Sequence, residues 1–362
     1  MVHRVYNFNP GPATLPLSVL EKAREELPDF EGNGMSIMEI SHRSKVFEKI
    51  IASAEADFLE LAGLNDDFQV LFLQGGASLQ FMMLPYNFLP PGKTADYIIT
   101  GSFASKAAQE AQLLGDVHIA YNSKSTGHRS IPRQAELAFS AQPAYVHLTT
   151  NNTIYGTQWK YVPDCGGVPL MADMSSDILS RKFDLSKFSL FYAGAQKNLG
   201  PAGVTVVVIR KSLLEEAQDN ISSMLSYKIH AEAASLYNTP PCFSIYVLKL
   251  VLDWIKEQGG VEALETVNNK KATAIYEAID KSEGFYKGHA ESDARSMMNI
   301  TFRLPNEELE KSFVDEASKE GLNGLKGHRS VGGIRASIYN AMSLEGCETL
   351  AQFMENFRRR NN

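Results

Sequence analysis

Short apolar runs recur along the first two thirds of the chain, with glycines and helical stretches between several of them. Hydrophobicity in these runs is continuous rather than alternating, which is typical of strands that are buried on both faces of a sheet. Helices packed on both faces of a mainly parallel sheet would provide this burial. We therefore predict about seven strands, at residues 69–73, 96–100, 117–121, 144–148, 168–172, 189–193 and 204–209.

The last two runs are joined by a short connection. Only residues 194–203 separate them, and a crossover between parallel strands usually needs more. We therefore expect the strand at 204–209 to run antiparallel to its neighbour.

After residue 211 the pattern changes to long helical stretches, and then to a mixture of helices and strands. These features indicate an α/β fold with a smaller α+β unit at its C-terminal end and a boundary near residue 260. The predicted helices are residues 243–258, 261–281, 306–321 and 344–360, and the predicted strands are residues 298–304 and 333–339.

Charge and cysteine usage narrow the class of protein. The chain has 362 residues, and its 35 Lys and Arg against 42 Asp and Glu leave a net charge of -7, which disfavours a nucleic-acid partner. Cys165, Cys242 and Cys347 are far apart and show neither a disulfide framework nor a zinc spacing. We therefore expect a cytoplasmic protein without a metal site. No apolar run approaches the roughly 20 residues that span a membrane, so we expect no membrane contact.

Lys197 and Asp173 are candidates for a catalytic pair. Lys197 lies in the glycine-rich sequence AGAQKNLGPAG, and Asp173 directly follows the run at 168–172. A lysine that binds covalently and a carboxylate that keeps a ring nitrogen protonated are what pyridoxal phosphate requires. A solvated loop lysine and an aspartate that caps a turn are the alternatives.

A candidate phosphate site and a candidate ring contact lie near other strand ends. The sequence QGGASLQ at 74–80 follows the first strand and begins a helical stretch, so its free amides and serine hydroxyl suit a phosphate. An ordinary glycine turn is the alternative. Phe103 follows the next strand and either stacks on a planar ring or belongs to the core.

Six longer motifs are spread over the chain: NFNPGPA (7–13), SIMEISHRS (36–44), ADMSSDILSR (172–181), YAGAQKNLGPAG (192–203), YNTPP (237–241) and LKGHRSVGGIRASIYNAM (325–342). Together they resemble the phosphoserine aminotransferases, a family of class V, fold type I pyridoxal phosphate enzymes. The resemblance implies a large cofactor-binding domain at 16–260 and a small α+β domain formed by 1–15 and 261–362.

The resemblance also implies roles for individual residues. Lys197 would carry pyridoxal phosphate and Asp173 would face its ring nitrogen, as the two catalytic residues. Further cofactor contacts would come from Ala77, Ser78, Phe103, Thr153 and Gln196, and from Asn238 and Thr239 across a homodimer. Phe103 and the Ala77-Ser78 pair replace the tryptophan and the Gly-Arg pair of other members. The substrate contacts would be His42, Arg43, His328, Arg329 and Arg335.

The implied reaction moves the amino group of L-glutamate to 3-phosphohydroxypyruvate, and a role in pyridoxine synthesis is an additional expectation. Arginine and histidine side chains suit the carboxylates and the phosphate of these substrates. The alternatives are a relative that uses another small amino donor, a cysteine desulfurase, and a non-catalytic protein that binds a phosphorylated metabolite.

Overall fold

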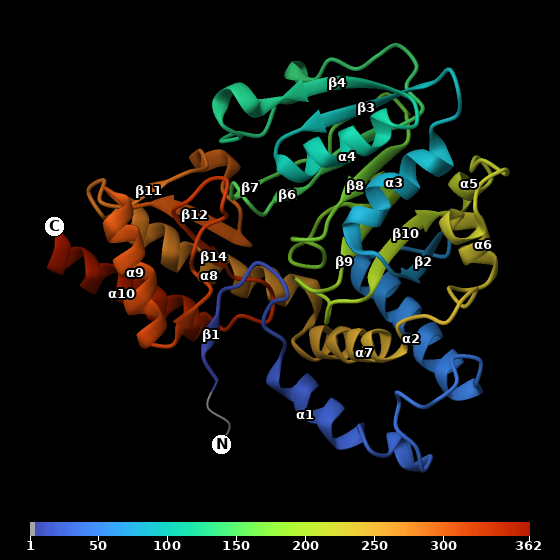
Figure 1. Ribbon diagram of the computed structural model, residues 1–362, viewed down its shortest axis with the longest axis horizontal. Helices are drawn as coiled ribbons and strands as arrows, with labels where there is room; N and C mark the ends of the chain where they lie inside the picture. The colour runs from blue at the N-terminus through green and yellow to red at the C-terminus, as the bar shows by residue number, and fades with distance from the viewer. Residues whose placement is uncertain (1–3) are drawn as a thin grey trace.

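The computed structural model describes residues 4–362, and a sheet of seven strands forms its centre (Figure 1). The order across the sheet is β2-β10-β9-β8-β5-β3-β4. All seven strands that the apolar runs predict are confirmed. They are β2 (Phe68–Leu73), β3 (Thr94–Ile99), β4 (Asp116–Asn122), β5 (Val146–Thr149), β8 (Leu170–Asp173), β9 (Leu190–Gly194) and β10 (Thr205–Arg210).

The strand β10 runs antiparallel to both of its neighbours, β2 and β9, as the short connection predicts. The remaining neighbours in the sheet pair in parallel. Parallel strands place their carboxyl ends at one edge of the sheet, where ligands bind in open α/β folds. The residues that follow β5, β8 and β9 therefore gather at this edge.

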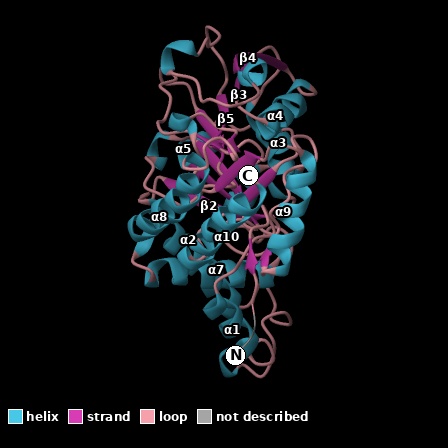
Figure 2. Ribbon diagram, turned by 90° about the vertical axis from the view of Figure 1, so that its left-hand side faces the viewer, coloured by secondary structure: helices cyan, strands magenta, loops and turns pink. Residues whose placement is uncertain are grey.

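Helices cover both faces of the sheet (Figure 2). On one face, α2 (Lys45–Ala62) and α7 (Cys242–Glu257) pack against residues such as Val206 and Val208. On the other, α3 (Gly76–Phe88) and α4 (Ser102–Gln112) pack against Val207 and Ile209. Both faces are thus buried, which explains the continuous apolar runs. No helix within residues 4–362 is long and apolar enough to cross a membrane.

A second core lies at the C-terminal end of the chain, around Phe302, Phe313 and Phe353. A three-stranded sheet with β12 at its centre contributes to this core. Phe8 also joins it, because β1 (Tyr6–Asn7) pairs in parallel with β13 (Leu322–Asn323). The elements are α8 (Gly260–Asp280), β11 (Lys287–Gly288), β12 (Asn299–Arg303), α9 (Glu307–Lys319), β14 (Ile334–Ser337) and α10 (Leu344–Asn361). The domain limits remain a prediction.

Several elements have no counterpart in the prediction. Two-residue strands are too short to show a period of hydrophobicity, and α1 follows the N-terminal motif without a strong apolar pattern. These elements are α1 (Leu17–Glu26), α2, β1, β6 (Asn151–Asn152), β7 (Thr157–Gln158), α5 (Lys211–Leu214), α6 (Tyr227–Glu232), β11 and β13.

Candidate active site

Lys197 lies on the turn that follows β9, at the carboxyl edge of the sheet. Its Nζ donates a 2.9 Å hydrogen bond to Thr153 Oγ1. Burial lowers the pKa of Lys197 to about 8. The negative charge of Asp173 raises this pKa, and the positive charge of Arg335 lowers it. An amine with this pKa gives up its proton more readily than an ordinary lysine, which suits nucleophilic attack and proton transfer.

Asp173 is the last residue of β8 and is 5% exposed. Its Oδ1 accepts the backbone N–H of Ser175 at 2.9 Å. Burial raises the pKa of Asp173, whereas the charge of Lys197 and the hydrogen bond from Ser175 lower it. The buried carboxylate of Asp173 therefore interacts electrostatically with the amine of Lys197.

The connection from β2 to α3 exposes an uncapped helix terminus. Gly75 and Gly76 both have positive φ, +88° and +65°, and no side chain caps the first turn of α3. A Cβ at Gly75 would lie 2.5 Å from the Cβ of Leu79, so only glycine fits there. The amides of Ala77 and Ser78 thus lie at a helix terminus that favours an anion.

Two further predicted cofactor residues lie close to Lys197. The Phe103 ring, in the first turn of α4, has its centroid 5.6 Å from Lys197 Nζ. The carbonyl of Gln196 accepts the N–H of Ala13 at 2.9 Å. The N-terminal NFNPGPA motif is thereby attached to the lysine turn.

Arg335 lies in β14 and is 7% exposed, yet its Nε has no hydrogen-bond partner. His328 and Arg329 precede this strand, and Ile154, His289, His328 and Arg335 line a small cavity. Burial lowers the pKa of His328, and the charges of Arg335 and Arg329 lower it further. Over residues 4–362, no carboxylate forms an ion pair with His328, Arg329 or Arg335. The two arginines therefore keep positive charge that can bind an anion, and the imidazole of His328 can add a hydrogen bond.

The other predicted residues do not join this cluster within one chain. His42 and Arg43 belong to the segment between α1 and α2, which lies at the lower right of Figure 1, away from β14. No hydrogen bond or ion pair of the described residues connects them to Lys197. Asn238 precedes α7, and its Nδ2 donates to Gln74 Oε1 at 3.0 Å, whereas its neighbour Thr239 is exposed.

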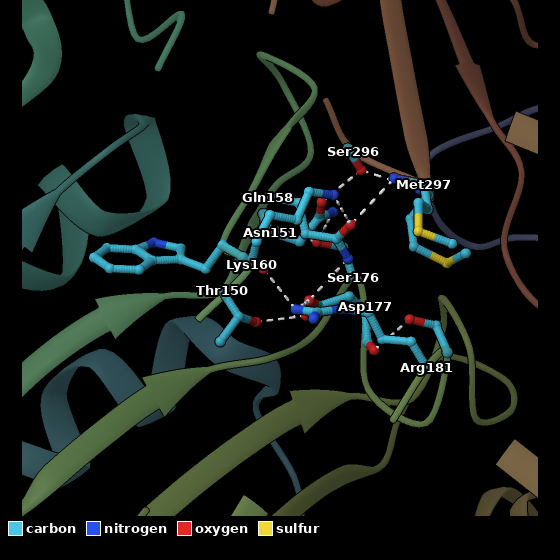
Figure 3. Close-up of polar contacts among 12 residues, drawn as sticks. Thr150, Asn151, Gln158, Lys160, Ser176, Asp177, Arg181, Ser296 and Met297 are labelled. Atoms are coloured by element: carbon cyan, nitrogen blue, oxygen red, sulfur yellow. Dashed lines mark hydrogen bonds and ion pairs between the residues drawn. The ribbon is translucent and has the colours of Figure 1, made fainter. Parts of the chain in front are cut away.

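A buried polar network surrounds Asp177, and the sequence pattern did not predict it (Figure 3). Thr150 Oγ1 donates to Asp177 Oδ1 at 2.5 Å, and Asn151 Nδ2 donates to Ser176 Oγ and to Asn299 Oδ1, both at 2.8 Å. These bonds connect the end of β5 and the loop after Asp173 to the start of β12. Asp177 is the second acidic residue of ADMSSDILSR, four residues after Asp173. This position was the sequence feature that could have indicated it.

The network continues to the residues around Arg335. Asn299 Nδ2 donates to Ser337 Oγ at 3.0 Å and to the Tyr339 hydroxyl at 3.1 Å. The N–H of Asn340 donates to Asn198 Oδ1 at 2.9 Å, one residue after Lys197. The strand that carries Arg335 is thus connected on both sides to the segments that carry Asp173 and Lys197.

The chain is similar to known proteins over nearly its whole length. The family model "Aminotransferase class-V" matches residues 5–350. Phosphoserine aminotransferase of Herpetosiphon aurantiacus is 60% identical over 98% of both chains. The solved phosphoserine aminotransferase of Bacillus circulans subsp. alkalophilus is 55% identical, covers 99% of each chain and superposes with a TM-score of 0.98. A pyridoxal phosphate-bound phosphoserine aminotransferase from Trichomonas vaginalis is 36% identical, covers 97% of this chain and 100% of its own, and has a TM-score of 0.91.

These matches extend over nearly the whole chain at high identity. The chain therefore belongs to the class V aminotransferases and, within them, to the phosphoserine aminotransferase family. The predicted family, fold type and pyridoxal phosphate cofactor are confirmed.

The side chains at the carboxyl edge fit this cofactor. The uncapped start of α3 suits the phosphate, the buried carboxylate of Asp173 suits a protonated ring nitrogen, and the lowered pKa of Lys197 suits covalent attachment. The three features lie at the ends of β2, β8 and β9, which face the same edge.

Proposed function

We propose that the protein transfers the amino group of L-glutamate to 3-phosphohydroxypyruvate, giving O-phospho-L-serine and 2-oxoglutarate. The observation that carries this proposal is the cluster of His328, Arg329 and Arg335. It lacks a carboxylate partner among the described residues, and the charge of its Arg335 acts on the amine of Lys197. Relatives of 54–60% identity named phosphoserine aminotransferase support it.

The cofactor is held by residues of five segments. Lys197 would hold it covalently, Asp173 would keep its ring nitrogen protonated, and Phe103 and Thr153 would contact it near the ring. Ala77, Ser78 and Gln196 would hold its phosphate. When bound, pyridoxal phosphate supplies a conjugated ring that accepts the electrons of the substrate Cα–H bond.

Lys197 moves the proton of the reaction. With a pKa of about 8, the amine has both protonation states accessible near neutral pH. With the cofactor and an amino acid in the site, the neutral amine of Lys197 would accept the proton from the substrate Cα, and the protonated amine would return it. Thr153 Oγ1 accepts a hydrogen bond from this amine and keeps it inside the site.

Arg335, Arg329 and His328 orient both substrates. Arg335 binds the α-carboxylate that both substrates share, because its place in a strand fixes the direction of the guanidinium. His328 and Arg329 bind the distal group, which is the phosphate of the acceptor or the side-chain carboxylate of glutamate. The same arrangement accepts the phosphorylated keto acid that leads to phosphohydroxythreonine in pyridoxine synthesis.

The active enzyme is a cytoplasmic homodimer with shared sites. Leu17 and Leu20, three residues apart on α1, and Met35 and Met38 after this helix are exposed apolar side chains that a second copy could cover. Asn238 and Thr239 of each protomer then reach the cofactor phosphate of the other. His42 and Arg43 lie away from Lys197 of their own chain. In the dimer they contact the substrate in the site of the other protomer.

A substrate survey of the purified enzyme tests the proposal. Glutamate should serve as donor for 3-phosphohydroxypyruvate and for the phosphorylated acceptor of the pyridoxine branch, with 2-oxoglutarate released in equal amount. Rapid turnover with glyoxylate or pyruvate and none with the phosphorylated acceptors would overturn it.

A further inference from the structure

Lys106 lies on the face of α4 that points toward the active site. It follows Phe103 by three residues, so both side chains lie on one side of the helix. Lys106 Nζ is 5.5 Å from the centroid of the Phe103 ring, and Lys197 Nζ is 5.6 Å from the same centroid. The two amines are therefore within about 11 Å of each other.

The charge of Lys106 is uncompensated and acts on the substrate cluster. No carboxylate within residues 4–362 forms an ion pair with Lys106. Besides burial, the charges of Arg335, Arg329 and Lys106 lower the pKa of His328. Lys106 is exposed on its helix. Its charge adds to the positive potential that Arg329 and Arg335 create at His328.

We propose that Lys106 is a specificity residue that binds the distal phosphate of the acceptor substrate. This inference rests on the proposed function, and it adds a residue that neither the sequence motifs nor the cavity beside Arg335 identifies.

The discrimination follows from the charge of the two distal groups. A phosphate monoester carries about -1.5 to -2 at neutral pH, whereas a carboxylate carries one charge. The electrostatic attraction of a flexible ammonium group is therefore stronger toward the phosphate than toward the glutamate side chain. Arg335 does not discriminate in this way, because the α-carboxylate is common to both substrates.

The test compares holoenzymes of the wild type, Lys106→Met and Lys106→Arg, with Lys93→Met as the matched control. Lys93 is an exposed lysine just before β3, at the opposite end of that strand from α4. Lys106→Met should lower kcat/KM for 3-phosphohydroxypyruvate on the order of 10-fold, mainly through KM, because one charge-assisted hydrogen bond is lost. For glutamate we expect a change of less than about 3-fold on the same argument. Lys106→Arg should retain most of the wild-type value, and Lys93→Met should match the wild type.

Titration calorimetry with inorganic phosphate separates this inference from the proposed function. Phosphate should bind the Lys106→Met holoenzyme more weakly than the wild type, whichever acceptor the enzyme prefers. A wild type that favours unphosphorylated acceptors would overturn the proposed function, and the phosphate titration would still decide the role of Lys106. Equal losses for glutamate and the phosphorylated acceptor, or unchanged phosphate binding, would overturn the role of Lys106.

Discussion

Lys197 donates a 2.9 Å hydrogen bond to Thr153, which connects the turn after β9 to the segment between β6 and β7. The contact holds the lysine amine over the carboxyl edge of the sheet, where burial lowers its pKa to about 8. A single side chain is thereby both directed into the site and made easier to deprotonate.

Cofactor attachment should depend on pH through this amine. Only the neutral form of Lys197 is nucleophilic, so the rate at which pyridoxal phosphate attaches to cofactor-free protein should rise with pH and level off above about 8. Stopped-flow absorbance measures this rate. Lys197→Ala should give no borohydride-stable adduct, and a wild-type rate that keeps rising toward 10.5, the ordinary pKa of lysine, would contradict the expectation.

Asp173→Asn should move the same rate profile to lower pH. The negative charge of Asp173 raises the pKa of Lys197, so its removal leaves burial and Arg335 to lower that pKa further. The amide is nearly the same size as the carboxylate, which makes it a suitable control for packing. A profile that moves to higher pH would show that the two groups do not interact as the structure indicates.

Lys271 is predicted to stabilise the segment after β14. It is fully buried, and its Nζ donates to the carbonyls of Ile338, Tyr339 and Met342 at 3.1, 2.9 and 3.1 Å. Lys271→Met leaves these carbonyls without their donor, so the free energy of unfolding should fall by roughly 3 kcal/mol. Urea denaturation measures the loss, and Lys311→Met, an exposed lysine on α9, should change it little.

The pH dependence of stability offers a second test of Lys271. Burial lowers its pKa to about 8 in the folded state, whereas the unfolded state has the ordinary value of 10.5. Between these values the unfolded chain binds more protons, so this residue makes wild-type stability rise as the pH rises. Lys271→Met should lack that part of the rise. If the free energy of unfolding changed with pH by the same slope in both proteins, the lowered pKa of Lys271 would be contradicted.

Much of the fold could be predicted because its physical causes are local. The run at 204–209 is continuously apolar because β10 is covered on both faces, and its short connection required an antiparallel strand. The Asn151–Asn299 hydrogen bond could not be predicted, since it joins residues 148 positions apart and polar contacts follow no period. The unpaired Nε of Arg335 is likewise visible only once β14 is buried.

Hybrid dimers should recover activity if the sites are shared. Lys197→Ala removes the attachment of the cofactor, and Thr239→Val combined with Asn238→Ala weakens the phosphate contact that we propose to cross the interface. Each variant alone should be nearly inactive. A mixture should regain up to about a quarter of wild-type activity, because random pairing leaves one complete site in half of the dimers. A monomer with full activity in sedimentation would end this model.

Arg335→Lys should raise KM for glutamate and for the phosphorylated acceptor together. Lysine keeps the charge but cannot form the paired hydrogen bonds of a guanidinium with a carboxylate. Loss of such a bond predicts an increase on the order of 10-fold in both KM values. Steady-state kinetics with each substrate varied in turn measures this, and an effect on one substrate only would reassign Arg335 to a distal group.

Recognition of a distal phosphate defines the proposed reaction, and the ratio of kcat/KM for two acceptors measures it. With glutamate as donor, kcat/KM for 3-phosphohydroxypyruvate should exceed that for hydroxypyruvate on the order of 10- to 100-fold or more, because charge-assisted hydrogen bonds to the phosphate are lost in the smaller acceptor. Equal values for the two acceptors would contradict the claim and would indicate a transaminase for small unphosphorylated acids.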